Sequence, residues 1–329
     1  MKKDAQAQNQ PSSSPRRRLL RGAAAIGAAA AGYGVLRELN ASPVPSPSAT
    51  LGTERAVQQL VPGELAINDG DMRLYRALPQ RVRHNVGPFV FVDHYRHKSL
   101  RGLGDTPHPH AGIEVISYLL QGSMEHRDSM GFRDKLLAGD GQHIRAGRGI
   151  LHAEQPLSGR HGLQMWLSLP PALAAAEPTY TKIPAADVPR FTQKGVQGEV
   201  LAGLINGQQG PMQLASGAMF AYTRLQAKAS ARFDVPEGKE LAVYVVEGSV
   251  QVQGQRVDTG SLALLAPGTS ISATAADGQP AQFALIGGDP IQHEIYFGGP
   301  FVANSRQALL RMRDDFLAGK MGTLEGTPF

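Results

Sequence analysis

The sequence contains no cysteine, which excludes disulfide bonds, iron–sulfur clusters and thiolate metal sites. Any metal ion must therefore be bound through nitrogen and oxygen ligands. Aromatic residues make up only 6% of the 329 residues, and Trp166 is the one tryptophan. The absence of cysteine does not decide the cellular compartment, because such a chain folds equally well in reducing and oxidising surroundings.

The chain also has no net charge once its first forty residues are set aside. Residues 1–40 contain seven basic and two acidic side chains, which accounts for the whole formal charge of +5. The body of the protein is therefore neutral, and we expect no nucleic-acid surface on it.

Residues 1–40 predict an export signal. Arg16 and Arg17 open a basic stretch, and small apolar residues follow over 22–34. This order is typical of a signal peptide, and paired arginines are typical of the twin-arginine pathway. We expect a periplasmic protein whose signal is cleaved or kept as its only membrane anchor; the alternative is a cytoplasmic protein with a basic tail. Residues 41–60 indicate a flexible linker.

Short β-rich runs bounded by Gly, Pro or Asp fill the rest of the chain, which predicts an all-β fold. Residues 118–124 and 244–250 are similar, since each runs from an apolar strand into a Gly-Ser turn. A second, weaker similarity joins 138–141 to 258–261. We infer that one barrel has been duplicated.

The duplication predicts the domain limits. We expect a metal-binding barrel over 61–190, a second barrel over 191–300, and a short α-helix and tail over 301–329. Asn304 is the expected N-cap of that helix, and Gly319 suits its C-terminal end.

Two pairs of residues predict a metal site. Side chains two apart on a strand point to the same side, so His108 and His110 share a face, as do His152 and Glu154. Three imidazoles and a carboxylate buried in one barrel without a cation would cost several kcal/mol in desolvation. The sequence therefore predicts one divalent metal with an N₃O ligand set, and an octahedral ion would keep about two open positions.

The metal itself is less determined. Fe(II) is favoured, because His/carboxylate sites with open positions serve dioxygen chemistry. Mn, Ni, Cu and Zn suit the same donors.

Several motifs resemble those of the pirin family, within the cupin superfamily. The motifs are His-Pro-His-Ala-Gly-Ile-Glu at 108–114, Ala-Gly-Arg-Gly-Ile-Leu-His-Ala-Glu at 146–154, Gly-Pro-Phe-Val-Ala-Asn at 299–304, and Gly-Pro-Phe-Val-Phe-Val-Asp at 87–93. The resemblance implies two tandem cupin barrels, jelly-roll-like double-stranded β-helices, with one metal, usually iron, in the first. It carries over His108, His110, His152 and Glu154 as the metal ligands.

Further side chains are expected near these ligands. Glu114, the carboxylate of the general cupin motif, has the same parity along the chain as His110, so it is expected to hydrogen-bond a ligand or to replace Glu154 as one. His126 and Asp128 are expected at the mouth of the pocket, with His126 beside the ligands; the alternative is a solvent-facing hairpin. In the second barrel, Asp234 and Pro236 fall at the places of His108 and His110, so we expect no metal there.

Three functions fit these residues. Pirin-like proteins include quercetin 2,3-dioxygenases, which implies ring cleavage of a flavonol with O₂ and release of carbon monoxide, with Glu154 accepting the substrate proton. The alternative from another class is a non-catalytic metal- or redox-sensing binding protein. A cupin acting on a different phenol or enol is the third. We expect a small phenolic substrate with O₂, and a monomer.

Overall fold

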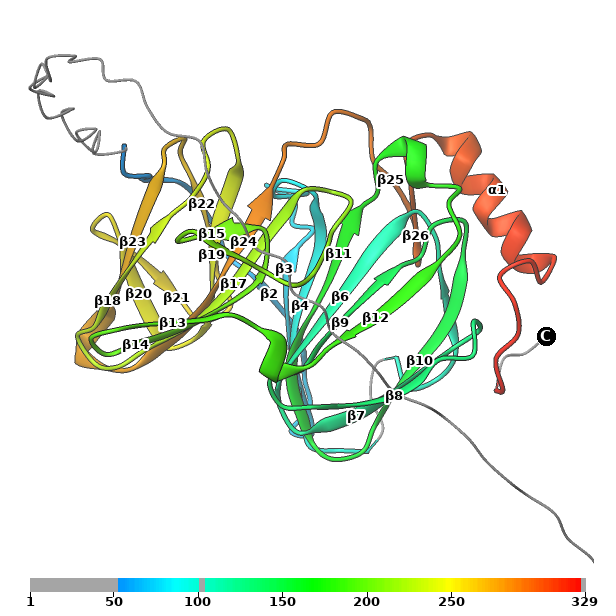
Figure 1. Cartoon of the computed structure of the whole chain (residues 1–329), viewed down its shortest axis with the longest axis horizontal. Helices are drawn as coiled ribbons and strands as arrows, with labels where there is room; N and C mark the ends of the chain where they lie inside the picture. The colour runs from blue at the N-terminus through cyan, green and yellow to red at the C-terminus, as the bar shows by residue number, and fades with distance from the viewer. Residues whose placement is uncertain (1–52, 101–103, 327–329) are drawn as a thin grey trace, which may run out of the picture. The chain divides into compact units, whose positions relative to one another are not determined.

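Two β-barrels follow one another along the chain in a computed structural model, which describes residues 53–100 and 104–326 (Figure 1). The predicted signal, with Arg16 and Arg17, lies outside the described residues. In the described part of the chain, no helix has the length and apolar character needed to cross a bilayer.

The first barrel consists of a seven-stranded and a four-stranded antiparallel sheet. The larger sheet has the order β12 (Thr179–Ile183), β9 (Gly141–Arg145), β6 (Ile113–Gln121), β11 (Arg160–Ser168), β4 (Phe89–His97), β3 (Met72–Leu78) and β2 (Glu64–Asn68). The smaller sheet has the order β5 (His108–His110), β10 (Ile150–Pro156), β7 (Ser123–Asp128) and β8 (Arg133–Leu137).

The second barrel repeats this arrangement. Its larger sheet has the order β1 (Val57–Val61), β22 (Leu262–Leu265), β19 (Glu240–Glu247), β24 (Ala281–Gly288), β17 (Ala218–Leu225), β14 (Val196–Ala202) and β13 (Arg190–Gln193). Its smaller sheet has the order β18 (Ser230–Asp234), β23 (Ser270–Ala275), β20 (Ser249–Val252) and β21 (Gln255–Asp258). Apart from the outermost strands β12 and β1, corresponding strands follow in the same order, which confirms the predicted tandem cupin fold.

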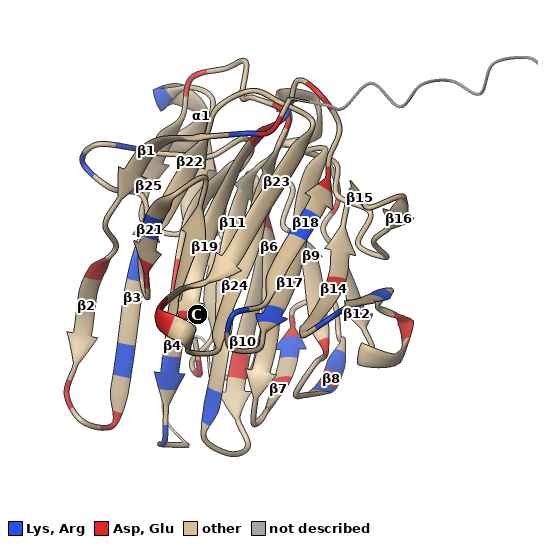
Figure 2. Cartoon of the chain, turned by 90° about the vertical axis from the view of Figure 1, so that its left-hand side faces the viewer, with Lys and Arg blue, Asp and Glu red and all other residues tan. Residues whose placement is uncertain are grey.

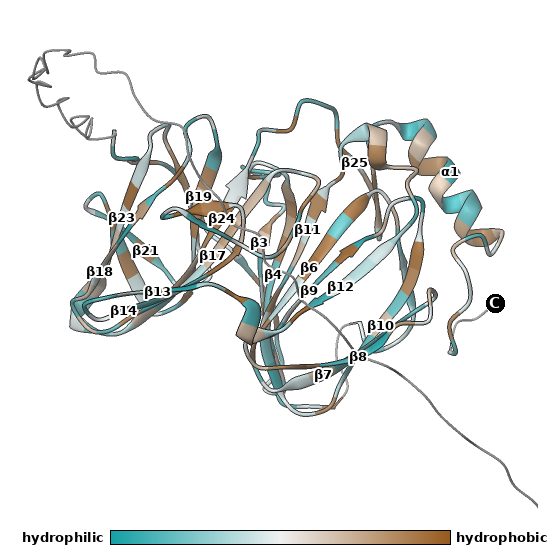
Figure 3. Cartoon of the chain, in the orientation of Figure 1, coloured by the Kyte–Doolittle hydropathy of each residue, from teal (hydrophilic) through white to brown (hydrophobic). Residues whose placement is uncertain are grey.

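The two large sheets pack face to face. Tyr118 of β6 lies with its ring 5.7 Å from that of Phe220 and 5.6 Å from that of Tyr222, both on β17. In β19 alternate residues serve two cores, since Tyr244 faces the other barrel while Val243 faces the interior of its own. Burial on both sides explains the nearly continuous apolar runs of these strands, which are brown in Figure 3.

The expected linker over 41–60 extends too far. Residues 57–60 belong to β1, which pairs antiparallel with β22 of the second barrel, so the chain crosses to the second barrel before it forms the first. Arg55, 1% exposed, anchors this crossing through hydrogen bonds to the carbonyls of Gly268, Lys239 and Ala266.

Shorter elements complete the fold. They are the two-stranded pairs β15 (Leu204–Ile205) with β16 (Gln208–Gln209) and β25 (Tyr296–Gly298) with β26 (Phe301–Ala303), the 3-10 turns η1 (Pro171–Leu173), η2 (Ala185–Asp187) and η3 (Ala276–Gly278), and helix α1 (Arg306–Leu317). The N-cap of α1 is Ser305 rather than Asn304, because the Ser305 hydroxyl accepts the hydrogen bond from the Ala308 N–H. Acidic and basic residues are interspersed along the strands in Figure 2, as a neutral body would show.

Candidate metal centre

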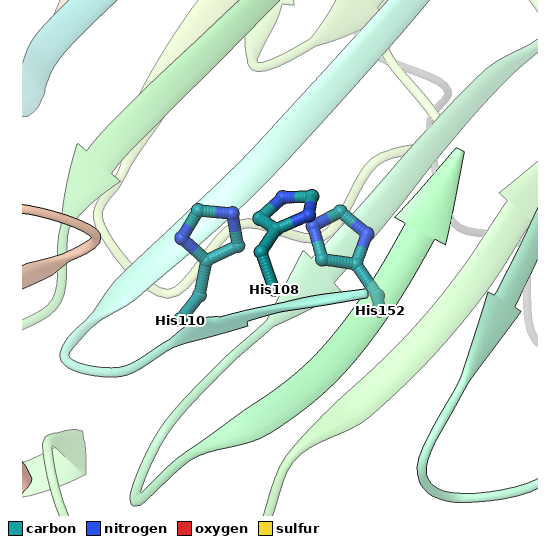
Figure 4. A group of neighbouring side chains, drawn as sticks. All are labelled: His108, His110 and His152. Atoms are coloured by element: carbon teal, nitrogen blue, oxygen red, sulfur yellow. The ribbon is translucent and has the colours of Figure 1, made fainter. Parts of the chain in front are cut away.

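His108, His110 and His152 converge inside the first barrel (Figure 4). Strands β5 and β10 pair so that His108 lies opposite His152, and His110 is two residues further along the same face. One nitrogen from each ring lies within 4.8 Å of the other two. After small ring rotations this spacing suits a shared ion with bonds of about 2.1 Å.

Hydrogen bonds on the outer ring nitrogens define the tautomers. The Nδ1–H of His108 donates to the Thr106 carbonyl (2.9 Å), and the Nδ1–H of His110 donates to the Pro300 carbonyl (3.2 Å). In the neutral form of either ring, Nε2 is therefore the unprotonated nitrogen that can bind a cation. The Nε2 atom of His110 and both ring nitrogens of His152 are buried and have no hydrogen-bond partner in the described part of the chain. Buried ring nitrogens without a hydrogen-bond partner fit a bound metal.

Burial also keeps two of the three imidazoles, those of His110 and His152, uncharged. It lowers the pKa of His110 to about 3, with a further contribution from His108. Burial, then the neighbouring imidazoles, lowers the pKa of His152 well below its ordinary value. Neutral imidazoles are the form that binds metals, so protons do not compete for these two side chains near pH 7.

Glu154 lies beside the three imidazoles. Its Oε1 atom is 3.9 Å from Nδ1 of His152 and accepts hydrogen bonds from the Gln142 amide (2.6 Å) and the Ser117 hydroxyl (3.0 Å). Its Oε2 atom lies 3.8 Å from the guanidinium of the buried Arg160. The carboxylate is thus fixed at the edge of the cluster, with one oxygen held by donors.

The cluster opens into a pocket of about 520 Å³, a volume suited to a small organic ligand. Strands β3, β4 and β11 provide most of its lining, together with the β25–β26 hairpin. The lining includes the aromatic rings of Phe91, Trp166 and Phe297 and the charged side chains of Arg76, Asp93 and Arg160.

One wall of the pocket is a column of stacked groups. The Trp166 ring stacks on Phe91 (4.1 Å, 15°) and meets the edge of His110 at 4.9 Å. The guanidinium of Arg76 covers the Phe91 ring at 4.5 Å and forms a bidentate ion pair with Asp93 (2.7 and 2.8 Å). Both faces of Phe91 are thus covered, and the column gives the pocket an aromatic wall next to the predicted metal.

Glu114 does not contact the predicted ligands, contrary to expectation. It lies on the opposite face of β6, where its carboxylate accepts hydrogen bonds from His143 and from the N–H groups of Ala215 and Ser216 in the second barrel. Burial raises the pKa of Glu114, but these donors outweigh it and the net shift is downward. The parity argument from His110 failed because Gly112, at φ +77°, interrupts the strand between them.

His126 and Asp128 are buried rather than part of a solvent-facing hairpin. Nε2 of His126 lies 3.1 Å from the Asp128 carboxylate, and the His126 ring stacks on Tyr180 at 4.1 Å. Its ring centre is 5.7 Å from that of His152. His126 therefore packs behind a predicted ligand, away from the residues that line the pocket.

The second barrel places apolar side chains where the first places its predicted ligands. Aligning the paired strands from their Gly-Ser turns puts Phe233 and Val235 at the positions of His108 and His110. The same alignment puts Ile271 and Ala273 at those of His152 and Glu154. All four are buried in the core of that barrel. The expected positions, Asp234 and Pro236, were one residue too late.

A chain of buried histidines lies at the interface of the barrels, outside the metal cluster. Arg96 donates to Nδ1 of His161 (3.2 Å), which fixes the remaining order: His161 Nε2–H donates to His94 Nε2 (2.7 Å), and His94 Nδ1–H donates to the Tyr244 hydroxyl (3.1 Å). Burial, then the neighbouring His161 and Arg96, lowers the pKa of His94 to about 3. Burial, then Arg96, lowers the pKa of His161 to about 4. Both imidazoles are therefore neutral at pH 7.

The two buried histidines, His94 and His161, predict that the fold is sensitive to acid. Both folded-state pKa values lie below the value of about 6.5 in an unfolded chain. The unfolded state therefore binds more protons at acidic pH. The stability that the two neutral histidines contribute is present above pH 6.5 and is lost as pH falls towards 4. Between pH 7 and pH 4, the free energy of unfolding of the metal-free parent should fall. In metal-free His161→Gln this fall should be smaller than in the parent by about 2 to 4 kcal/mol. Urea unfolding from pH 7 to 4 tests this, with exposed His84→Gln as the control. Parallel curves for His161→Gln and the parent would contradict it.

Sequence reasoning missed several residues of the site. Ser117 had a visible signal, since it is a polar residue within an apolar strand. Gln142 and Arg160 had none, because a single glutamine or arginine in a short strand is usually solvent-facing. The Pro300 carbonyl belongs to a motif that was recognised, but its contact with His110 spans 190 residues.

Two tandem barrels of matching strand order, with a three-histidine group in the first, define a bicupin. The Pirin family model matches residues 71–167, and the model of the pirin C-terminal cupin domain matches residues 220–322. This chain belongs to the pirin family.

Individual relatives agree with this assignment. The chain is 33% identical to a pirin-like protein of Caulobacter vibrioides, over 81% of this chain and 99% of the relative. It is 31% identical to pirin of Homo sapiens, over 76% and 88%. Among solved structures, quercetin 2,3-dioxygenase from Acinetobacter baumannii superposes with a TM-score of 0.75 at 26% identity, covering 82% of this chain and 99% of that one.

Proposed function

We propose that this protein is a metal-dependent dioxygenase that opens the ring of a flavonol or a closely related phenol with O₂ and releases carbon monoxide. The observation that carries the proposal is the three-histidine group and Glu154 at the base of a pocket with an aromatic wall. The likeness to a quercetin 2,3-dioxygenase supports the same reaction class.

His108, His110 and His152 would hold the ion, with Glu154 as a fourth ligand or a neighbour. We propose Fe(II), with Mn, Ni, Cu and Zn as the other candidates that nitrogen and oxygen donors accept. When bound, a redox-active ion supplies Lewis acidity and one-electron chemistry with O₂.

The protein's own groups would bind and deprotonate the substrate. Trp166 and Phe91 give the flat ring system an aromatic wall to pack against. Gln142 and Ser117 occupy Oε1 of Glu154, so Oε2 is the oxygen positioned to accept the proton of the substrate hydroxyl. Arg160, 3.8 Å from that oxygen, stabilises the negative charge in the pocket.

An oxygen electrode tests the proposal directly. The protein reconstituted with each of the five metals should, with at least one of them, consume O₂ and bleach the flavonol absorbance in equal amounts, with carbon monoxide as a product. Anaerobic samples serve as the control. Metal binding without turnover for any of the five would contradict the proposal and favour a non-catalytic metal-sensing role.

We propose further that the chain is exported to the periplasm through its twin arginines. The support is in the sequence alone: Arg16 and Arg17 precede a short apolar stretch. Cell fractionation of the full chain should find it outside the cytoplasm, and a variant with Arg16→Lys and Arg17→Lys should remain inside. Equal distribution of the two proteins would contradict export by this pathway.

A further inference from the structure

The chain returns to the first barrel after completing the second. The segment 296–317 comprises β25, β26 and α1, and Figure 1 shows α1 beside strands of the first barrel. Phe301 forms a parallel bridge with Ala111, and the Val302 N–H donates to the Ala111 carbonyl at 3.2 Å. The residue directly after His110 is thus bound to a segment almost two hundred positions away.

The contact at Gly112 is too close for any other residue. A Cβ atom at that position would lie 1.9 Å from the Val302 carbonyl oxygen and 2.8 Å from the terminal methyl of Met312. Because backbone cannot move aside as a side chain can, the end of β5 and the C-terminal segment are fitted to each other.

The segment also supplies a part of the predicted metal centre. The Pro300 carbonyl accepts the Nδ1–H hydrogen bond of His110. This bond selects the tautomer in which Nε2 faces the cluster, and it fixes the rotation of the ring. Phe297 and Gly299 of the same hairpin line the pocket.

Helix α1 holds the hairpin in place through a small apolar core. That core joins the segment to the backs of both ligand strands, since Ala111 follows His110 and Leu151 precedes His152. Met312, 8% exposed, is the buried residue of the helix. The cluster consists of Ala111, Leu151, Phe301, Ala303, Met312 and Met321.

We propose that metal binding and docking of the 296–317 segment are coupled, so that the docked segment positions His110 for the ion and the bound ion stabilises the docked segment. The inference rests on the metal binding proposed above. It makes the Pro300 carbonyl a positioning group of the site. The coupling is reciprocal, because any change of metal affinity on docking must equal the change of docking on metal binding.

Two variants of one helix test the first direction. Met312→Ser removes a buried contact of α1, whereas Leu310→Ser changes a side chain that is 50% exposed on the same helix. We expect Met312→Ser to weaken Ni(II) binding about tenfold or more, the range seen when an outer partner of a metal ligand is lost. Leu310→Ser should bind like the parent. Equilibrium dialysis of the full chain measures both, and parent-like affinity in Met312→Ser would overturn the coupling.

Hydrogen exchange of the parent chain tests the other direction and needs no variant. Ni(II) should slow exchange in peptides from 296–317 several-fold, although this segment contains no predicted ligand, while peptides from β18 and β23 should be unchanged. Equal exchange rates in 296–317 with and without Ni(II) would overturn the proposal. Neither readout depends on turnover, so a protein that binds Ni(II), protects this segment and lacks dioxygenase activity would refute the proposed function alone. A parent chain that binds no metal would refute both.

Discussion

Replacing His110 by alanine should reduce metal affinity on the order of 100-fold or more, and the protein should retain less than stoichiometric metal after desalting. The ring is 1% exposed, its Nδ1–H is held by the Pro300 carbonyl, and its Nε2 has no other partner among the described residues. Losing a ligand should cost more than the 10- to 100-fold typical of losing an outer partner. Elemental analysis of the desalted protein gives the metal content, and far-UV circular dichroism reports the fold.

The control for this variant is His97→Ala. His97 is also buried and lines the same pocket, but its ring accepts a hydrogen bond from Arg160 at 2.7 Å and lies outside the three-histidine group. It should retain metal within a few-fold of the parent. Equal losses of metal in the two variants would mean that metal binding depends on both imidazoles to the same extent. That result would contradict the proposed ligands.

Glu154→Gln should lower turnover by about 10² to 10⁴, the usual contribution of a general base. The amide keeps the size of the side chain and cannot accept a proton at neutral pH. Because the three imidazoles remain, the variant should still bind metal, so the loss appears mainly in kcat rather than in metal content. Steady-state assays at saturating metal test this across pH 6 to 9.

Glu125→Gln is the matched substitution for Glu154→Gln. Glu125 lies on the neighbouring strand β7, paired with Gln155, and its carboxylate forms an ion pair with the exposed Arg133. It should leave turnover unchanged. A Glu154→Gln enzyme as active as Glu125→Gln would remove the carboxylate from the reaction.

Local patterns predicted the barrels and the convergence of the three histidines, because the signals involved are short in range. The Gly-Ser turns after β6 and β19 marked the duplication, and the spacing of His108 and His110 is a property of one strand. The same counting failed for Glu114, since the turn at Gly112 resets which face the next strand presents. A parity argument holds only within an unbroken strand.

The remaining errors come from contacts that no local pattern encodes. Strand β1 pairs with residues some two hundred positions later, so its sequence looked like the end of a linker. A fixed offset from Gly248 missed the alignment of Phe233 with His108 by one residue, because the connection before the next strand differs between the barrels. The Pro300 carbonyl is visible to sequence analysis only as part of a motif.

Anomalous diffraction at the absorption edge of the bound metal, from crystals grown with Fe(II) or Ni(II), would locate the ion itself. We expect one strong peak per chain, about 2.1 Å from a ring nitrogen of each of His108, His110 and His152. No peak in the first barrel, or a peak bound by other side chains, would contradict the proposed metal centre.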